Sequence, residues 1–231
     1  MDDALLKLLK SVSTPTVCDA LAGAHPNRVF TAYTRGTLVA TAPDGPPIVG
    51  YACTGKIAGK TPSPESPDSI RERRLAYYRH MASAKKPAIA VIEDMDYPDC
   101  VGAFWGEINA TLHKALGISG VLTNGVVRDL GDLPEDFPLV AGSVGPSLAF
   151  THVTGFGTPV SVFGLDVRAG DLIHADRHGA VVIPPDAISG LHEGITRLVE
   201  AEKTLVDTAG EPGFDIARLV DAWSKFDKTR S

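Results

Sequence analysis

The stretch that decides the fold runs from residue 87 to residue 123. It begins with PAIAVIE (87–93), continues through a loop into a helical pattern at 106–116, and ends with VLT (121–123). The first run is continuously apolar, as in strands buried on both faces of a central sheet. Strand, helix and strand joined by short connections are typical of a parallel crossover unit. The sequence therefore predicts an α/β fold around a parallel sheet.

Further elements are expected on both sides of this unit. Helices are predicted at 3–10, 14–21, 69–84, 185–208 and 214–226, and strands at 47–58, 159–163, 170–176 and 179–184. Thr14 is predicted to cap the second helix, because proline follows it at the first helical position. Asp171 and Asp176 are expected in the turns of a β-hairpin region. No repeat, low-complexity tract or linker interrupts the chain, so residues 1–231 are interpreted as a single domain.

Composition is that of an ordinary globular protein, with 231 residues, 44% hydrophobic, 22% charged and a net charge of −6. The sequence contains no run rich in lysine and arginine, so nucleic acid is not an expected partner. It also contains no stretch of the ~20 apolar residues that a membrane span needs, and its first residues lack a signal-peptide pattern. Three widely spaced cysteines form no CxxC pair, which favours a reducing, cytoplasmic compartment.

Charged residues gather where the crossover unit meets the next turn. Gly106 and Glu107 stand at the start of the predicted helix, where free backbone N–H groups can bind an anion and glycine permits close approach. Twenty residues separate Glu107 from Arg128. That spacing suits helix, turn and strand, and returns the chain to the same edge of the sheet. Ligands of open α/β sheets bind at such carboxyl-terminal strand ends, so we expect Glu107, Arg128 and Asp129 in one crevice.

The residue types at this edge are chemically complementary. Glu107 and Asp129 carry oxygen ligands that suit Mg²⁺ or Mn²⁺. Arg128 offers a planar donor fork for the carboxylate of a small oxo acid. The alternative is that Arg128 and Asp129 are charges in a solvated turn, and spacing alone does not decide between the two interpretations.

Three motifs resemble the 4-hydroxy-4-methyl-2-oxoglutarate aldolase family, also called RraA-like. They are STPTVCDAL (13–21), the pieces GEIN (106–109) and ISGVLTNGVVRDLGD (118–132), and VRAGDLIHAD with GAVVIP (167–184). The resemblance extends over most of the chain and is more specific to the superfamily than to one activity. It implies a layered β/β/α, swivelling-domain-like fold. It also implies a homo-oligomer, either a trimer or a dimer of trimers (hexamer), with active sites between subunits.

The resemblance also implies roles for individual residues. Asp129 would bind the metal directly, and Glu107 would hold a metal-bound water where the family typically has aspartate. The backbone amides of Gly106, Glu107 and Ile108 would hold the substrate carboxylate together with Arg128. Each of these roles is an expectation for the structure.

Two further acidic positions belong to the implied site. Asp132 matches an acidic residue that follows the Arg-Asp pair by three places in the family. The family also uses a glutamate from the C-terminal helix of a neighbouring subunit, and Glu202 or Glu200 could supply it. The sequence does not fix which of these two glutamates has the right register.

The activity that the resemblance implies is that of a metal-dependent lyase, a class II aldolase. It would cleave a 4-hydroxy-2-oxo acid, such as 4-hydroxy-4-methyl-2-oxoglutarate, to pyruvate, with oxaloacetate decarboxylation as a side activity. One alternative is a non-catalytic regulator of ribonuclease activity, as shorter superfamily members are. Another is a related lyase or hydrolase acting on a different oxo acid. The acidic residue at position 107 and the extended C-terminal helix favour an enzyme.

Other chemistry has less support. His152, His174 and His178 lie in one region, but no histidine metal site is expected there. His113 is interpreted as a surface or a satisfied core residue. Three lysines could in principle form a Schiff base with a carbonyl substrate, but nothing in the sequence marks them as buried: Lys56, Lys60 and Lys114.

Overall fold

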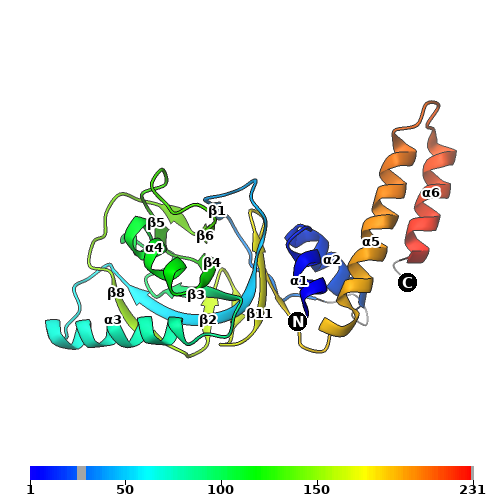
Figure 1. Cartoon of the computed structure of the whole chain (residues 1–231). Helices are drawn as coiled ribbons and strands as arrows, with labels where there is room; N and C mark the ends of the chain where they lie inside the picture. The colour runs from blue at the N-terminus through cyan, green and yellow to red at the C-terminus, as the bar shows by residue number, and fades with distance from the viewer. Residues whose placement is uncertain (25–29, 230–231) are drawn as a thin grey trace.

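The structure, a computed structural model, describes residues 1–24 and 30–229. Its centre is an eight-stranded mixed sheet in the order β1-β6-β4-β3-β2-β11-β12, with β8 also paired to β2 (Figure 1). From β6 to β2 the sheet is parallel, and the pairs at its margins are antiparallel. The strands are β1 (Val39–Ala40), β2 (Ile48–Ala58), β3 (Ala88–Asp94), β4 (Ile118–Thr123), β6 (Leu139–Ala141), β8 (His152–Phe156), β11 (Leu172–Asp176) and β12 (Gly179–Ile183).

The predicted crossover unit is present in the middle of the sheet. β3 is buried along almost its whole length and pairs in parallel with β4, and α4 (Glu107–Ala115) connects the two strands. Because β3 and β4 are parallel, their carboxyl ends meet at one edge, where the chain turns into the loops that carry the predicted site. The expected α/β fold with a parallel centre is confirmed.

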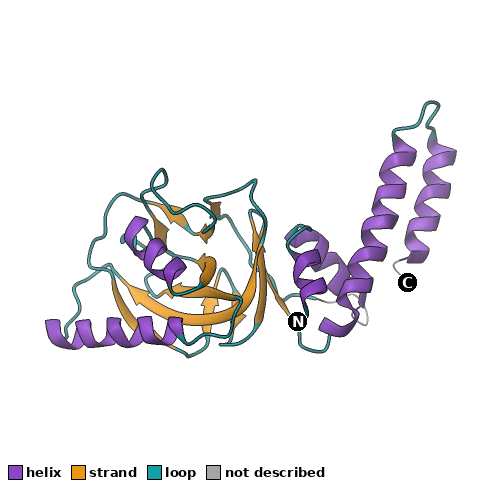
Figure 2. Ribbon diagram, in the orientation of Figure 1, coloured by secondary structure: helices purple, strands orange, loops and turns teal. Residues whose placement is uncertain are grey.

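Two layers cover the faces of this sheet (Figure 2). On one face, α3 (Pro67–Ala82) and α4 close a core that includes Tyr77 and Trp105. On the other face, the hairpin of β9 (Val160–Val162) and β10 (Leu165–Val167) packs over β3. This is the layered β/β/α arrangement that the sequence led us to expect.

The remaining helices form a separate layer beside β11 and β12. They are α1 (Asp3–Leu9), α2 (Thr14–Ala24), α5 (Ile188–Ala209) and α6 (Ile216–Thr229). α1, α2 and the first half of α5 share an apolar cluster with the sheet margin. Beyond this cluster α5 continues away from the sheet and pairs with α6, so the two form a projecting helical hairpin (Figure 1). In the part of the chain that the structure describes, no helix is both long and apolar enough to cross a membrane.

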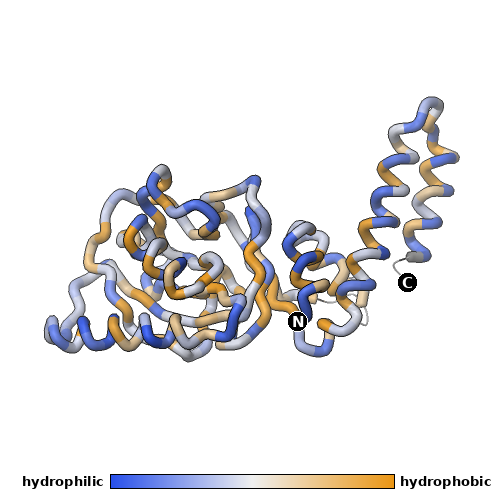
Figure 3. Tube along the Cα trace, in the orientation of Figure 1, coloured by the Kyte–Doolittle hydropathy of each residue, from blue (hydrophilic) through white to orange (hydrophobic). Residues whose placement is uncertain are grey.

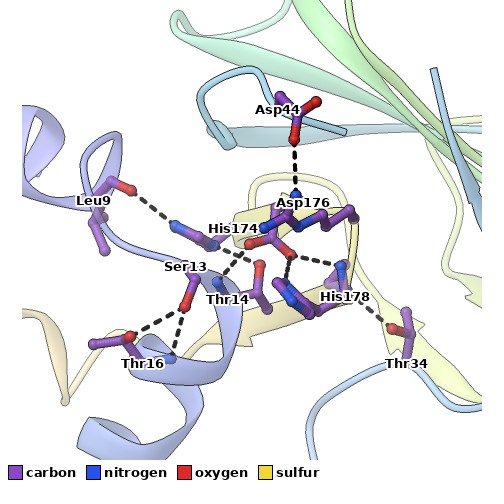
Figure 4. Close-up of polar contacts among 11 residues, drawn as sticks. Leu9, Ser13, Thr14, Thr16, Thr34, Asp44, His174, Asp176 and His178 are labelled. Atoms are coloured by element: carbon purple, nitrogen blue, oxygen red, sulfur yellow. Dashed lines mark hydrogen bonds and ion pairs between the residues drawn. The ribbon is translucent and has the colours of Figure 1, made fainter. Parts of the chain in front are cut away.

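A buried histidine joins the N-terminal helices to the sheet (Figure 4). His174 on β11 is fully buried. Its Nε2–H donates to the Leu9 carbonyl at 2.8 Å, and its Nδ1 lies 2.9 Å from the Thr14 hydroxyl. Since a carbonyl can only accept, the neutral ring must accept from Thr14 through Nδ1. Both ring nitrogens are therefore satisfied, and one side chain connects the end of α1, the start of α2 and the sheet.

The start of α2 differs from the prediction that Thr14 is the capping residue. α2 begins at Thr14 itself, and the Ser13 carbonyl accepts from the N–H of Val17. Ser13, at the N-cap position, accepts from the N–H of Thr16 through its Oγ at 3.5 Å. The N–H of Thr14 donates to the Asp176 carboxylate at 2.9 Å, so a strand residue adds a second cap from outside the helix. Asp176 also accepts from the backbone of His178 at 2.8 Å, which confirms its predicted place at a hairpin turn.

Candidate functional site

The Arg-Asp pair is placed beside α4 by a short strand. β5 (Val126–Val127) follows the turn after β4, and Val127 forms a parallel bridge with Trp105. The N–H of Arg128 donates to the Trp105 carbonyl at 2.8 Å. Trp105 stands just before the first turn of α4, so this pairing sets Arg128 and Asp129 against the N-terminus of that helix. The predicted convergence of these positions is therefore present in the structure.

The Asp129 carboxylate lies directly at the N-terminus of α4. Its Oδ2 accepts from the backbone N–H of Glu107 at 3.2 Å. Asp129 has a φ of +56°, in the left-handed region that only a few residue types tolerate, aspartate among them. Gly106, at the N-cap position of α4, provides no side-chain cap of its own. The helix end that was predicted to bind a substrate carboxylate is thus in contact with a carboxylate of the chain itself.

Gly106 is required by this close approach. A Cβ at position 106 would collide with the Asp129 carboxylate and would come within 2.9 Å of the Arg128 side chain. The φ of Gly106 is −159°, an extended conformation that any residue can adopt. The need for glycine is therefore steric and arises from the side chains that gather at this point.

The Arg128 guanidinium is only partly satisfied. Its Nε lies 3.5 Å from Asp129 Oδ2, an ion-pair distance, and its side chain is 30% exposed. Nε itself is buried and makes no hydrogen bond within the described residues. A buried donor without a partner is costly, so the arrangement favours an anionic ligand that would accept from it.

The other predicted site residues have less direct contact with the Arg128–Asp129 pair. Asp132 is tied to Asp129 through the backbone, because its N–H donates to the Asp129 carbonyl at 3.0 Å, and its side chain is exposed. Ile108 is 68% exposed on the first turn of α4. Glu200 and Glu202 lie on α5, on the opposite side of the molecule from α4 and β5 (Figure 1). Within one chain they are therefore not brought to Asp129, and their role in a neighbouring subunit's site stays a prediction.

The donor set fits a hydrated divalent cation. Among residues 1–24 and 30–229 there is no group of three or more His, Cys, Asp or Glu side chains arranged to hold a metal. Such a group would be needed for a site of the structural zinc type. Mg²⁺ keeps several waters and needs only one or two carboxylates. The Asp129 carboxylate, whose side chain is 34% exposed, can provide one of them.

Two residues behind the site had no role in the sequence-based interpretation. Asp94 ends β3 and is 2% exposed, and burial raises the pKa of its carboxyl group. The Asn124 side chain accepts from the Asp94 N–H at 2.7 Å and donates to its carbonyl at 3.3 Å. This clamp ties the ends of β3 and β4 together. The sequence signal for these two residues was the apolar run of β3, which ends in acidic residues, and the Asn124-Gly125 pair that follows β4.

The side chains suggested for other chemistry have structural partners. His113 accepts from the Tyr77 hydroxyl at 2.7 Å and donates to the Asn109 carbonyl at 2.6 Å. Burial lowers its pKa to about 4. Of the two predicted alternatives, a surface residue or a satisfied core residue, the structure shows the second. The three candidate lysines pair with a surface carboxylate or a loop carbonyl: Lys56 with Glu93, Lys60 with Asp99 and Lys114 with the carbonyl of Glu135.

Known proteins resemble the chain in sequence and in structure. It is 33% identical over 114 residues to a protein of Halalkalibacterium halodurans named "Putative 4-hydroxy-4-methyl-2-oxoglutarate aldolase". That match covers 48% of this chain and 52% of the relative. A match to an uncharacterized protein of Methanocaldococcus jannaschii, 30% identical over 105 residues, covers 45% of this chain and 50% of the relative. The chain thus spans about half the length of these curated relatives.

Solved structures share the fold over most of the chain. An uncharacterized protein of Pseudomonas syringae superposes with a TM-score of 0.71 at 20% identity, covering 97% of this chain and 95% of that protein. RraAS2 of Streptomyces coelicolor, described as an unusual member of the RNase ES inhibitor RraA family, superposes with a TM-score of 0.66 at 20% identity. That superposition covers 91% of this chain and 98% of RraAS2. The sequence profile described as "RraA-like: Aldolase/RraA" matches residues 14–182, so the chain belongs to the RraA-like family.

Proposed function

We propose that this protein is a divalent-metal-dependent lyase that cleaves a 4-hydroxy-2-oxo acid to pyruvate and a second carbonyl compound. One observation carries the proposal: the Arg128–Asp129 pair meets the N-terminus of α4 at the carboxyl edge of the parallel sheet. This places a metal-type oxygen ligand, a guanidinium and helix amides around one point. The sequence similarity to a protein named as an aldolase supports the same reaction class.

The residues have distinct tasks in such a reaction. Arg128 and the backbone N–H groups at the start of α4 would bind the carboxylate of the substrate and orient its 2-oxo group. Asp129 would hold Mg²⁺ or Mn²⁺. When bound, the cation would act as a Lewis acid for the charge that develops on the oxo oxygen. Because Arg128 and Asp129 are neighbours in sequence, the groups that bind the substrate carboxylate and the metal would be held next to each other by the backbone.

The bond changes follow from the substrate chemistry. A base removes the proton of the 4-hydroxyl group, the bond between C3 and C4 breaks, and the electron pair passes to the enolate of pyruvate. The enolate takes up a proton at C3 from a water held by Arg128. Decarboxylation of oxaloacetate reaches the same enolate, so we expect it as a side activity. Asp132 lies close enough in the chain to orient a water, and Glu200 or Glu202 of a neighbouring subunit would face it in a homo-oligomer.

The test is a pyruvate-release screen over a panel of 4-hydroxy-2-oxo acids with Mg²⁺ or Mn²⁺. Activity should disappear in excess chelator and return with added metal. Full activity in chelator, together with trapping of a substrate adduct by borohydride, would show a Schiff-base lysine instead and overturn the proposal. Absence of turnover on every acid would favour the other candidate, a regulator of ribonuclease activity, which the fold shared with RraAS2 makes worth assaying.

A further inference from the structure

The helix end that would receive the substrate carboxylate is already occupied by a carboxylate of the chain. Asp129 Oδ2 accepts from the N–H of Glu107 at 3.2 Å and lies 3.5 Å from Arg128 Nε. It therefore contacts the helix amide and faces the guanidinium that a substrate carboxylate would need. Gly106 adds no capping side chain, so Asp129 acts as the cap of α4 from the loop that follows β5.

We propose that Asp129 is an internal competitor for the carboxylate subsite at the N-terminus of α4, and that its side chain must leave before an anionic ligand can bind. This inference rests on the proposed function, because the same site is taken to bind the oxo acid. Two carboxylates cannot both accept from the Glu107 N–H and lie against Arg128 Nε without strong repulsion. The position that a ligand carboxylate would take is thus filled by the residue that is also the expected metal ligand.

The backbone around Asp129 allows this exchange without refolding. Its main chain is fixed on both sides, by the Arg128 N–H bonded to Trp105 at 2.8 Å and by the Asp132 N–H bonded to the Asp129 carbonyl at 3.0 Å. The side chain is 34% exposed and can rotate towards solvent. If the Asp129 carboxylate turned to ligate a cation, it would no longer accept from the Glu107 N–H. Metal binding at Asp129 and binding of a ligand carboxylate at the start of α4 would therefore strengthen each other.

The test measures anion binding without metal and without turnover. The probe is acetate, which has no 2-oxo group and so cannot chelate a metal through one. Its affinity would be measured in excess chelator by following the Glu107 amide resonance during titration of the full-length protein. The variants are Asp129→Gly, which suits the positive φ, and Asp129→Asn, which keeps a neutral cap. Glu135→Gln is the control, because it removes the same charge from an exposed position in the same loop.

Acetate should bind Asp129→Gly at least about tenfold more tightly than the wild type, with Asp129→Asn between the two. Equal affinity in the wild type and Asp129→Gly would overturn the proposal, since Asp129 would then not compete. An equal gain in Glu135→Gln would overturn it too, because general charge would explain the effect. Either result leaves the aldolase proposal untouched, while a failed turnover screen would leave the anion result standing.

Discussion

The hydroxyl of Thr14 and the Nδ1 atom of His174 lie 2.9 Å apart, across a separation of 160 residues in the chain. The ring donates from Nε2 to the Leu9 carbonyl, and in its neutral form it accepts from Thr14 through Nδ1, so both ring nitrogens are satisfied. Burial lowers the pKa of His174, because the interior disfavours the imidazolium. The attachment of α1 and α2 to the sheet therefore depends on an unprotonated histidine.

Acid should weaken the fold through this histidine. A histidine whose folded pKa lies below its unfolded value of about 6.5 binds more protons when unfolded, so stability falls as pH drops below that value. His113, with a pKa of about 4, acts in the same direction. The free energy of unfolding in urea should fall between pH 7 and pH 5, and the fall should be smaller in His174→Gln. The exposed His192→Gln variant is the control, and a slope in His174→Gln equal to that of the wild type would exclude the histidine.

Gly106→Ala should impair the site. The added Cβ collides with the Asp129 carboxylate and crowds the Arg128 side chain, so both must move. Displacement of about 1 Å at a reacting group can cost about 10² in rate, which is the expected loss of kcat/KM for pyruvate release. Overpacking should also destabilise the protein by about 1–3 kcal/mol.

Gly131→Ala is the matched control for this change. It lies two residues after Asp129, and a Cβ there would have no neighbour within 4 Å among the described residues. Its activity and Tm should equal those of the wild type. If both alanine variants lost activity equally, flexibility of the loop would explain the effect and crowding at Asp129 would not.

Arg128 and Asp129 should be separable by their effects. Asp129→Ala should abolish Mg²⁺ binding, measured by calorimetry, and nearly all turnover. Arg128→Lys keeps the charge but loses the planar fork, so kcat should fall by about 10²–10³ while Mg²⁺ still binds. Arg177→Lys is the surface control, because Arg177 pairs with an exposed aspartate, Asp44, at 2.9 Å. A normal kcat in Arg128→Lys would remove the arginine from the mechanism.

The sequence was most informative where structure is set locally. The apolar run at β3 and the helical pattern of α4 predicted the crossover unit, because burial on both faces and amphipathic spacing leave direct marks in the sequence. Because β3 and β4 were expected to be parallel, the chain was predicted to return to the same edge of the sheet. These two facts were enough to bring position 107 close to positions 128 and 129.

Contacts supplied from distant strands could not be predicted in this way. Thr14 looked like a cap because proline follows it, yet its own N–H donates to the Asp176 carboxylate, 162 residues away. The N-terminus of α4 looked open to ligands, and Asp129 fills it. In both cases an aspartate on another element satisfies the helix, and no spacing within the helix sequence could reveal it. A contact of Glu200 or Glu202 with a second chain would depend on how chains assemble, which the spacing of residues within one sequence does not reveal.

The helical hairpin gives a physical reason to expect shared active sites. α5 and α6 project from the sheet, and hydrophobic and hydrophilic residues alternate along both helices (Figure 3). Some of the apolar side chains are exposed, among them Val206 on α5. The exposed apolar side chains of α6 follow a helical spacing: Ile216, Val220 and Trp223. Apolar surface of this kind is typical of contacts between chains. If a neighbouring chain covers it, Glu200 or Glu202 could reach that chain's Asp129.

A subunit-mixing experiment tests this arrangement. Asp129→Ala protein and a Glu200→Ala/Glu202→Ala double variant should each be inactive, because each lacks one half of every site. After mixing and reassembly, some interfaces will join an intact Asp129 to an intact glutamate, so part of the pyruvate-releasing activity should return. The control is the same procedure with Asp129→Ala and Arg128→Ala, which remove groups from the same half of the site and should regain nothing. Mixed oligomers that contain both variants by mass spectrometry and stay inactive would place the whole site within one chain.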